Sequence, residues 1–524
     1  MGRPEKSGIN ERDPIQDAMG RLGIWQLVIT VALSIVDMPA AWHELAIPVI
    51  APGQDFTCIS PVPMNPSDSM LKACYVKVNE SLPEVKCEKF SYDVTDFKST
   101  IISEWDLVCD RKLLLSLVQP LTQLGILSGN LISGIVADKI GRKTPLMIAL
   151  SIQALAGLAT SFMPTFELFL IFKLISAVAT GGTMLIGFSI VVEIVSVHYR
   201  SSVLILYQIS FALGFLMVPG FSYLTRTWDG YWRMIALPSF FLLSYYWLIP
   251  ESPRWLLAHG RVEEARQVLL KAAKWNKISP ETVNAAIESH EKLLTATAKS
   301  IEIEPKRKSY GITDLLRTPT MRMRTMFIAF NWFKDGMVFF GSEYYLGRMS
   351  DSVLTNLAIS ALSQFPALVL AYFLTPRVSR LKVMAYSNVV AGISMLLIIP
   401  FYNNDTAKLI VVSIGSTCLT LSFLTGNLYT GELFPTVVRN IGYAICNVSS
   451  KSGSMISPFL IDYVNEIAYW VVPLCFGIAP IVGAGFCYWL PETMDCKLPE
   501  TLEDGENFKR LVLKQAFEFS LIKV

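Results

Sequence analysis

Five charged side chains stand inside long apolar runs of the sequence, where a charge seldom persists without a function. They are Asp37, Lys173, Lys334, Asp335 and Lys451. Each such charge costs about 2.5–3.5 kcal/mol at the centre of a membrane-spanning helix, and it usually faces a cavity or a partner. These residues are therefore the first candidates for binding a charged solute. Ion pairs inside the protein are the alternative for each of them.

Lys451 is the clearest candidate because it lies in the small-residue stretch "ICNVSSKSGSMISPFL" (445–460). Small neighbours leave room for a ligand, and serine hydroxyls can help to solvate an ammonium group. A charged lysine at such a position needs a partner. We expect a substrate carboxylate or sulfonate in the loaded protein and Asp335 in the empty one. Asp335 could instead neutralise Lys334, and Lys451 could belong to an internal ion pair.

The apolar runs predict an all-α, polytopic membrane protein. Hydrophobic residues make up 52% of the 524 residues and charged residues only 17%, whereas a soluble domain has about a quarter charged residues. The runs are near the length of about 20 residues that a helix needs to cross the hydrocarbon core. We predict twelve spans, at 24–43, 113–137, 145–163, 166–188, 203–222, 232–249, 325–345, 353–374, 383–401, 408–430, 441–463 and 470–490.

The spans divide the chain into two six-helix halves with polar segments around them. These parts are the N-terminus 1–23, the first half 24–249 with a large outer segment 44–112, the linker 250–324, the second half 325–490 and the tail 491–524. The short loops "DKIGRK" (138–143) and "PRVSRLK" (376–382) are basic, while segment 44–112 has eleven acids against seven bases. Because basic loops stay in the cytoplasm, we expect both termini to be cytoplasmic and segment 44–112 to be extracellular.

The outer segment also has the composition of an extracellular cap. It holds four of the nine cysteines, Cys58, Cys74, Cys87 and Cys109. An even number in an oxidising compartment predicts two disulfides, with three connectivities open. The sequence "NES" at Asn79 is an acceptor for N-glycosylation.

Three motifs recur in the two halves at nearly one offset. "DKIGRK" begins at 138 and "PRVSRL" at 376, 238 residues later; Glu193 and Arg200 recur as Glu432 and Arg439, 239 later; "PES" at 250 recurs as "PET" at 491, 241 later. The offsets predict two parallel repeats, as in major facilitator transporters.

The repeated motifs suggest a gate at the cytoplasmic helix ends. Two helical turns separate each acid from its base, so each pair can share a face and hold the inner ends together. Surface charge that only sets topology is the alternative. The candidate gating residues are Gly134, Asp138, Gly141, Arg142, Glu193, Arg200, Arg377, Arg380, Glu432 and Arg439.

Longer motifs resemble one family within the major facilitator superfamily. "STIISEWDLVCD" (99–110), "PESPRWLLAHGRVEEA" (250–265), "ELFPTVVRNIG" (432–442) and "LPETLEDGENF" (498–508) are similar to those of the organic cation/anion/carnitine transporters. The resemblance covers nearly the whole chain. It implies uptake or exchange of small organic ions across the plasma membrane by alternating access.

The resemblance also bears on the sign of the substrate. Cation carriers of the family have an acid where this chain has Lys451, and another where it has Gln364; anion carriers have a lysine where it has Leu368. The cation pattern is thus missing, and Lys451 favours an organic anion or a carnitine-like zwitterion. The candidate substrate contacts are Lys451, Asp335, Lys334, Asp37, Gln364, Phe340 and Tyr344.

Composition and motifs argue against several other classes. A net charge of +2 does not fit a nucleic-acid binder, and the sequence has no nucleotide-binding loop. The four histidines at 43, 198, 259 and 290 are scattered, so we expect no metal site. We also expect no cofactor and no enzymatic activity. The expected partners are the lipid bilayer and a small organic ion, with any coupling ion open. An organic cation carrier, a carrier of neutral solutes and a non-transporting receptor remain alternatives.

Replacing the glycan acceptor tests the placement of the outer segment. Asn79→Gln should remove a glycan-sized mass shift on a gel after expression in a host that glycosylates membrane proteins. If glycosidase treatment of the natural protein leaves its mobility unchanged, the glycan is absent.

Overall fold

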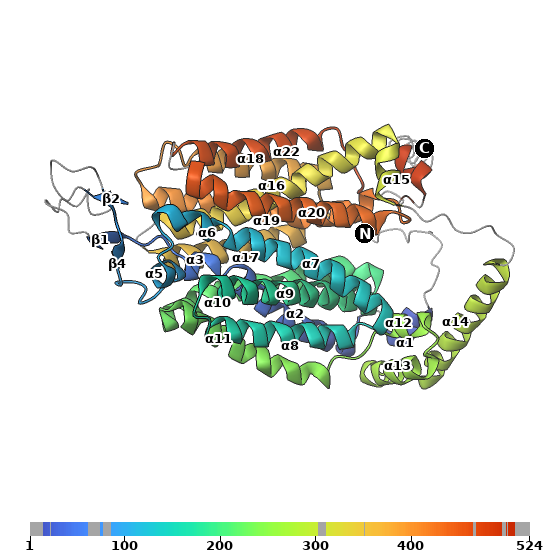
Figure 1. The fold of residues 1–524 in the computed structure, drawn as a ribbon. Helices are drawn as coiled ribbons and strands as arrows, with labels where there is room; N and C mark the ends of the chain where they lie inside the picture. Colours follow the sequence, from blue (N-terminus) through green and yellow to red (C-terminus); the bar gives the residue numbers. More distant parts are fainter. Residues whose placement is uncertain are drawn as a thin grey trace.

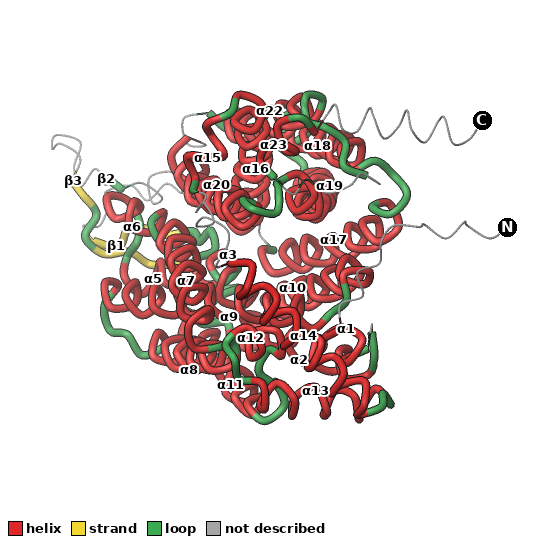
Figure 2. The backbone as a smooth tube through the Cα atoms, turned by 90° about the vertical axis from the view of Figure 1, so that its right-hand side faces the viewer, coloured by secondary structure: helices red, strands yellow, loops and turns green. Residues whose placement is uncertain are grey.

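The architecture is that of two helical bundles side by side (Figures 1 and 2). The structure is a computed structural model, and it describes residues 14–20, 22–60, 74–76, 85–301, 311–349, 352–464, 468–494, 499 and 501–508. The first bundle contains α2 (Ile24–Glu44), α7 (Val118–Ile140), α8 (Lys143–Thr160), α9 (Phe166–Ile194), α10 (Val197–Thr225) and α11 (Trp228–Leu242). The second contains α16 (Pro319–Met349), α17 (Val353–Leu374), α18 (Arg380–Leu396), α19 (Asp405–Leu433), α20 (Arg439–Phe459) and α22 (Val471–Cys487).

Each predicted span falls on one of these helices, which confirms the polytopic helical fold. Within the described residues, seven helices are long and apolar enough to cross a membrane. The spans on α11, α18 and α22 have shorter helices, of 15, 17 and 17 residues. Those on α16 and α20 carry more polar residues, and α16 contains Lys334 and Asp335. Both polar spans contribute residues to the candidate site, together with α2 and α7.

The outer segment forms a small cap at one end of the bundles, here called the outer end (Figure 1). It includes α3 (Ile47–Ile50), α5 (Ile101–Trp105), η1 (Cys109–Arg111) and α6 (Lys112–Ser116). Two antiparallel sheets depart from the all-α prediction, one of β1 (Phe56–Ser60) with β4 (Lys89–Tyr92), the other of β2 (Tyr75–Val76) with β3 (Val85–Lys86). Two disulfides close the cap, Cys58–Cys87 and Cys74–Cys109. Asn79 lies outside the described residues.

The opposite end, here called the linker end, carries α12 (Pro253–Ala258), α13 (Val262–Asn276), α14 (Pro280–Ile301) and α15 (Ile312–Arg317) (Figure 1). Helix α1 (Pro14–Met19) packs there against α13 and α14. The Asn276 side chain accepts a hydrogen bond from the Trp25 amide (3.1 Å) and donates one to the Gln26 side chain (2.7 Å). Because the first amides of a helix lack partners within it, Asn276 fixes the linker to the start of α2.

Close helix packing in the second bundle depends on glycine. A Cβ at Gly453 of α20 would collide with the Phe333 carbonyl of α16, and one at Gly336 would collide with the Ser450 carbonyl. Small residues at such crossings let helix backbones approach within a membrane. The two helices therefore cross beside Lys451 of α20. This close contact fixes the position of the lysine relative to α16.

Replacement of the packing glycine should destabilise the protein selectively. Gly453→Ala should lower the melting temperature of the purified protein in detergent, because the methyl group must displace α16. The matched control is Gly485→Ala on α22, where no atom lies within 4 Å of the added Cβ. There the change should be neutral or stabilising, since alanine favours a helix by about 1 kcal/mol over glycine. Equal melting shifts for both variants would contradict this packing.

Candidate substrate pocket and gating clusters

A pocket lies between the two bundles, toward the outer end. Its lining comes from the end of α2 and the following α3, from α7 and from α16. The lining residues are Glu44, Leu45, Ile47, Pro48, Gln119, Phe340, Glu343 and Tyr344. Two of them, Phe340 and Tyr344, are predicted substrate contacts. The pocket thus brings together both halves of the chain, two carboxylic acids, an amide and two aromatic rings.

Lys451 forms an ion pair with Glu44 beside this pocket. Its Nζ lies 2.6 Å from the Glu44 Oε1, and the two side chains are 12% and 1% exposed. The Lys451 ammonium also lies over the Phe340 ring, 5.4 Å from its centroid. The expected pairing of Lys451 with Asp335 in the empty protein is therefore wrong. The actual partner belongs to the other half of the chain, so this ion pair joins the two bundles.

Lys334 and Asp335 instead neutralise each other inside the second bundle. The Lys334 ammonium contacts the Asp335 carboxylate and the Asn388 side-chain oxygen, and donates a hydrogen bond to Ser422 (3.2 Å). Lys334 is fully buried, and neither residue lines the pocket. Their contacts join α16, α18 and α19, which indicates a structural role in helix packing.

The two remaining predicted contacts, Gln364 and Asp37, and the buried charge of Lys173 also lie away from the pocket lining. Gln364 accepts a hydrogen bond from the Thr420 hydroxyl and thereby links α17 to α19. Asp37 is 4% exposed within the first bundle. Lys173 donates to the His43 carbonyl oxygen (2.6 Å) and lies 4.5 Å from the Trp232 ring centroid. Lys173 thus holds α9 against the end of α2, directly beside Glu44.

Glu343 is a pocket carboxylic acid that the sequence reasoning omitted. Its Oε1 accepts a hydrogen bond from the Ser360 hydroxyl (2.6 Å). Its Oε2 is buried and has no hydrogen-bond partner among the described residues, and the residue as a whole is 1% exposed. Because a buried carboxylate without a partner is costly, Glu343 marks a place where a ligand can donate a hydrogen bond.

Further hydrogen bonds join the bundles at the outer end. Asp462 of η3 (Leu460–Val464) accepts from the Ser116 hydroxyl of α6 across the two halves (2.6 Å), and from the Tyr344 hydroxyl within the second half (2.7 Å). The Gly53 amide donates to the Gly347 carbonyl (2.9 Å). Together with the Lys451–Glu44 pair, these contacts close the pocket toward the outer end.

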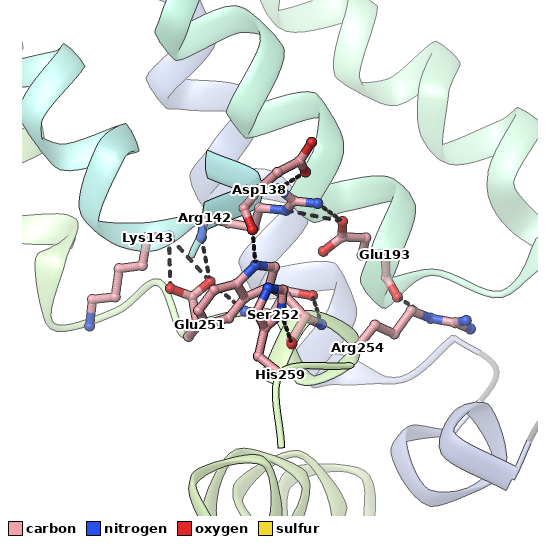
Figure 3. Close-up of polar contacts among 9 residues, drawn as sticks. Asp138, Arg142, Lys143, Glu193, Glu251, Ser252, Arg254 and His259 are labelled. Atoms are coloured by element: carbon pink, nitrogen blue, oxygen red, sulfur yellow. Dashed lines mark hydrogen bonds and ion pairs between the residues drawn. The ribbon is translucent and has the colours of Figure 1, made fainter. Parts of the chain in front are cut away.

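At the linker end, the first bundle contains a compact cluster of charges (Figure 3). Arg142 donates to Asp138 (2.6 Å) and to Glu193 (3.1 Å). Burial alone would lower the pKa of the Arg142 guanidinium, but the two carboxylates outweigh it and raise that pKa above its usual value. Glu251 accepts hydrogen bonds from the amides of Arg142 (2.7 Å) and Lys143 (3.2 Å). A carboxylate at a helix N-terminus also interacts favourably with the helix dipole.

Gly141 makes room for this capping carboxylate. Its φ is +105°, and a Cβ there would collide with the Glu251 carboxylate. Both facts favour glycine at this turn. The Trp255 indole of α12 donates to the Asp138 carbonyl (2.9 Å) and fixes the other side of the turn.

The second bundle repeats the arrangement with the equivalent residues. Arg380 lies 3.3 Å from Glu432, as Arg142 pairs with Glu193. Glu492 accepts from the Arg380 amide (3.2 Å), as Glu251 accepts from that of Arg142. Ser379 takes the place of Gly141, and its hydroxyl donates to Glu492.

Two expectations about the gate are wrong in this structure. Glu432 pairs with Arg380 and not with Arg439, whose guanidinium donates to the Phe434 carbonyl (3.2 Å) and to Thr436 (3.2 Å). The ion pairs described here also lie within one bundle, so they do not join the inner ends of the two halves. Arg377 is exposed and donates to the Phe373 carbonyl (2.9 Å). The side chain of Arg200 lies outside the described residues, and Gly134 lies within α7.

Sequence reasoning missed several residues for identifiable reasons. Glu44 falls one residue beyond the predicted span 24–43 and was counted with the outer acids. Glu343 and Asp462 fall inside the predicted spans 325–345 and 441–463, where a full count of buried acids would have found them. Glu251 and Glu492 belong to the repeated "PES" and "PET" motifs, whose common offset was a signal for a shared role.

Comparison with known proteins gives consistent matches over most of the chain. Residues 65–503 match the family model described as "Sugar (and other) transporter". An organic cation transporter protein of Drosophila melanogaster is 32% identical over 95% of this chain and 94% of its own. Solute carrier family 22 member 2 of Homo sapiens is 33% identical over 79% and 72%. Member 3 of Mus musculus is 34% identical over 83% and 77%.

Solved structures with the same fold include the xylose transporter XylE of E. coli. Its inward open conformation superposes with a TM-score of 0.64 at 17% identity, covering 92% of this chain and 99% of that chain. A partially occluded inward open conformation gives 0.62 at 15% identity, covering 90% and 98%. At this level of identity the likeness concerns the fold.

The two acids that contact Arg142 should differ in importance. Glu193→Gln should lower both the melting temperature and the transport rate, because the Glu193 side chain is 21% exposed and its ion pair is partly buried. Asp138→Asn should have a smaller effect on both, because the Asp138 side chain is 73% exposed and an exposed pair contributes about 0–1 kcal/mol. Surface expression should be matched in both variants. A larger defect in Asp138→Asn than in Glu193→Gln would contradict this ranking.

Proposed function

The chain belongs to solute carrier family 22, within the major facilitator superfamily, and we propose that its own substrates are small organic cations. Membership makes it a membrane transporter of organic ions. The sign of the substrate has to be argued from the charges around the pocket.

The proposal depends mainly on the observation that Lys451 already forms an ion pair within the protein. Glu44 lies 2.6 Å from its ammonium group, so the pair contributes no net charge to the pocket. Glu343 lines the same pocket, and its Oε2 has no partner among the described residues. Burial favours the neutral form of a carboxyl group without a charged partner, whereas a cation bound at Oε2 stabilises its ionised form. A bound cation therefore gains Glu343 as its counter-charge, while an anion gains none from these three side chains.

This proposal replaces the anion preference drawn from the sequence. That preference required the charge of Lys451 to be available to the substrate. The family's acid is absent at this place in α20, but two other acids, Glu44 and Glu343, lie at the pocket. Glu44 of α2 and Glu343 of α16 could supply the negative charge in place of the family's acid.

A zwitterionic substrate is the second candidate, because one observation favours it. The Lys451 side chain is 12% exposed, whereas that of Glu44 is 1% exposed, so the ammonium is the more accessible member of the pair. A substrate carboxylate could displace Glu44 from Lys451 while the substrate's cationic group binds Glu343.

The closed outer end suggests how binding couples to movement. Lys451–Glu44 and Ser116–Asp462 join the two bundles there, while the arginine–glutamate pairs of the linker end stay within their bundles. We place the outer end outside the cell, since disulfides form in oxidising compartments. Opening to the outside would then require these contacts to separate. A cation that competes with Lys451 for Glu44 would assist that separation.

Uptake into liposomes by the purified protein should decide between the candidates. We expect saturable uptake of a small organic cation, and none of a comparable anion, because the pocket has an unpaired acid. Lys451→Ala should impair cation uptake, since it leaves Glu44 buried without its partner. If Lys451→Ala instead abolishes uptake of a zwitterion and leaves cation uptake unchanged, the second candidate is correct. Saturable anion uptake without cation uptake would reject both. Empty liposomes and the parent protein serve as controls.

A further inference from the structure

Resting on this proposed function, we propose that the pocket selects organic cations bearing N–H bonds, namely primary and secondary ammonium ions, over quaternary ammonium ions. We further infer that Glu343 is the specificity-determining residue. In this pocket the aromatic rings already contact cations of the protein, whereas the Glu343 Oε2 has no partner among the described residues.

Proteins hold organic cations in two chemically distinct ways. A quaternary ammonium has no N–H bond, and it is bound mainly by the faces of several aromatic rings. A primary ammonium has three N–H donors and is strongly hydrated. Its burial is favourable only when acceptors replace the lost water. The lining of a pocket therefore indicates which class it suits.

The aromatic faces of this pocket are partly taken by the protein's own cations. The Lys451 ammonium lies over the Phe340 ring, 5.4 Å from its centroid. The Arg348 guanidinium lies over the Tyr344 ring at 4.9 Å, and the Tyr344 hydroxyl donates to Asp462. Among the described residues, the lining contains no third aromatic ring. An aromatic cage for a quaternary ammonium is thus not formed by these residues.

The pocket also contains hydrogen-bond acceptors that an N–H donor of the substrate can reach. Ser360 holds the Glu343 Oε1 at 2.6 Å, which fixes the direction of the carboxyl group. The Glu343 Oε2 is buried and unpartnered within the described part of the chain. Gln119 and Glu44 add an amide and a second carboxylate to the same lining. An ammonium N–H can satisfy Oε2, whereas a quaternary ammonium would leave it without a hydrogen bond.

A pair of probes with the same aromatic group tests this selection directly. Initial uptake rates into liposomes would be measured for phenylethylamine and for phenylethyltrimethylammonium. The parent protein should have a KM about tenfold lower for the primary amine, because one unmade buried hydrogen bond is enough for a tenfold difference. Glu343→Gln keeps the size of the side chain and removes its charge. It should reduce this ratio of KM values to about twofold or less, mainly by raising the KM of the primary amine.

Two further variants separate this role from a general effect on folding. Ser360→Ala retains the carboxylate but frees its orientation, and should reduce the KM ratio by a smaller factor. Glu281→Gln alters an exposed acid of α14 and should leave the ratio unchanged. Equal KM values for the two probes in the parent protein would overturn the inference, and so would an unchanged ratio in Glu343→Gln. If the parent carries the quaternary ion but not the amine, the selection fails and cation transport stands. If it carries neither cation, both proposals fail.

Discussion

The organisation of the pocket depends on one buried ion pair, between Lys451 of the second bundle and Glu44 of the first. Removing one partner of a buried pair typically costs about 3–5 kcal/mol, because the other charge is left uncompensated. Each residue therefore requires the other whenever no ligand replaces it. The pair joins the two bundles beside the pocket, and it leaves Glu343 as the pocket acid whose Oε2 has no partner among the described residues. The sign of the pocket and the closure of the outer end both follow from it.

The two halves of the chain use the same parts at the linker end. In each bundle an arginine at the start of one helix pairs with a glutamate at the end of the next, and a second glutamate accepts from that arginine's amide. These ion pairs connect helices within each bundle. The contacts between bundles described here lie at the outer end. This division of contacts suits a carrier in which two rigid halves rock against each other.

Sequence patterns predicted the features that depend on local properties. Apolar runs placed the twelve helices, and the common offset near 240 residues identified repeats whose equivalence is now visible in the Arg142 and Arg380 clusters. Features set by the packing of distant segments were harder to predict. Lys451 and Glu44 are 407 residues apart, and the sequence around each residue does not indicate that the other is its partner. Likewise, four cysteines allowed three pairings, and Arg439 was assigned to Glu432 on helical spacing although Arg380 lies closer in the fold.

Exchanging the charges of Lys451 and Glu44 tests most directly whether the two side chains neutralise each other. Cation uptake and melting temperature would be measured for Lys451→Glu, for Glu44→Lys and for the double variant. We predict that each single variant is strongly impaired, because two like charges then face each other, and that the double variant recovers much of the loss. A double variant no better than the worse single variant would contradict the pairing, as would single variants that behave like the parent protein.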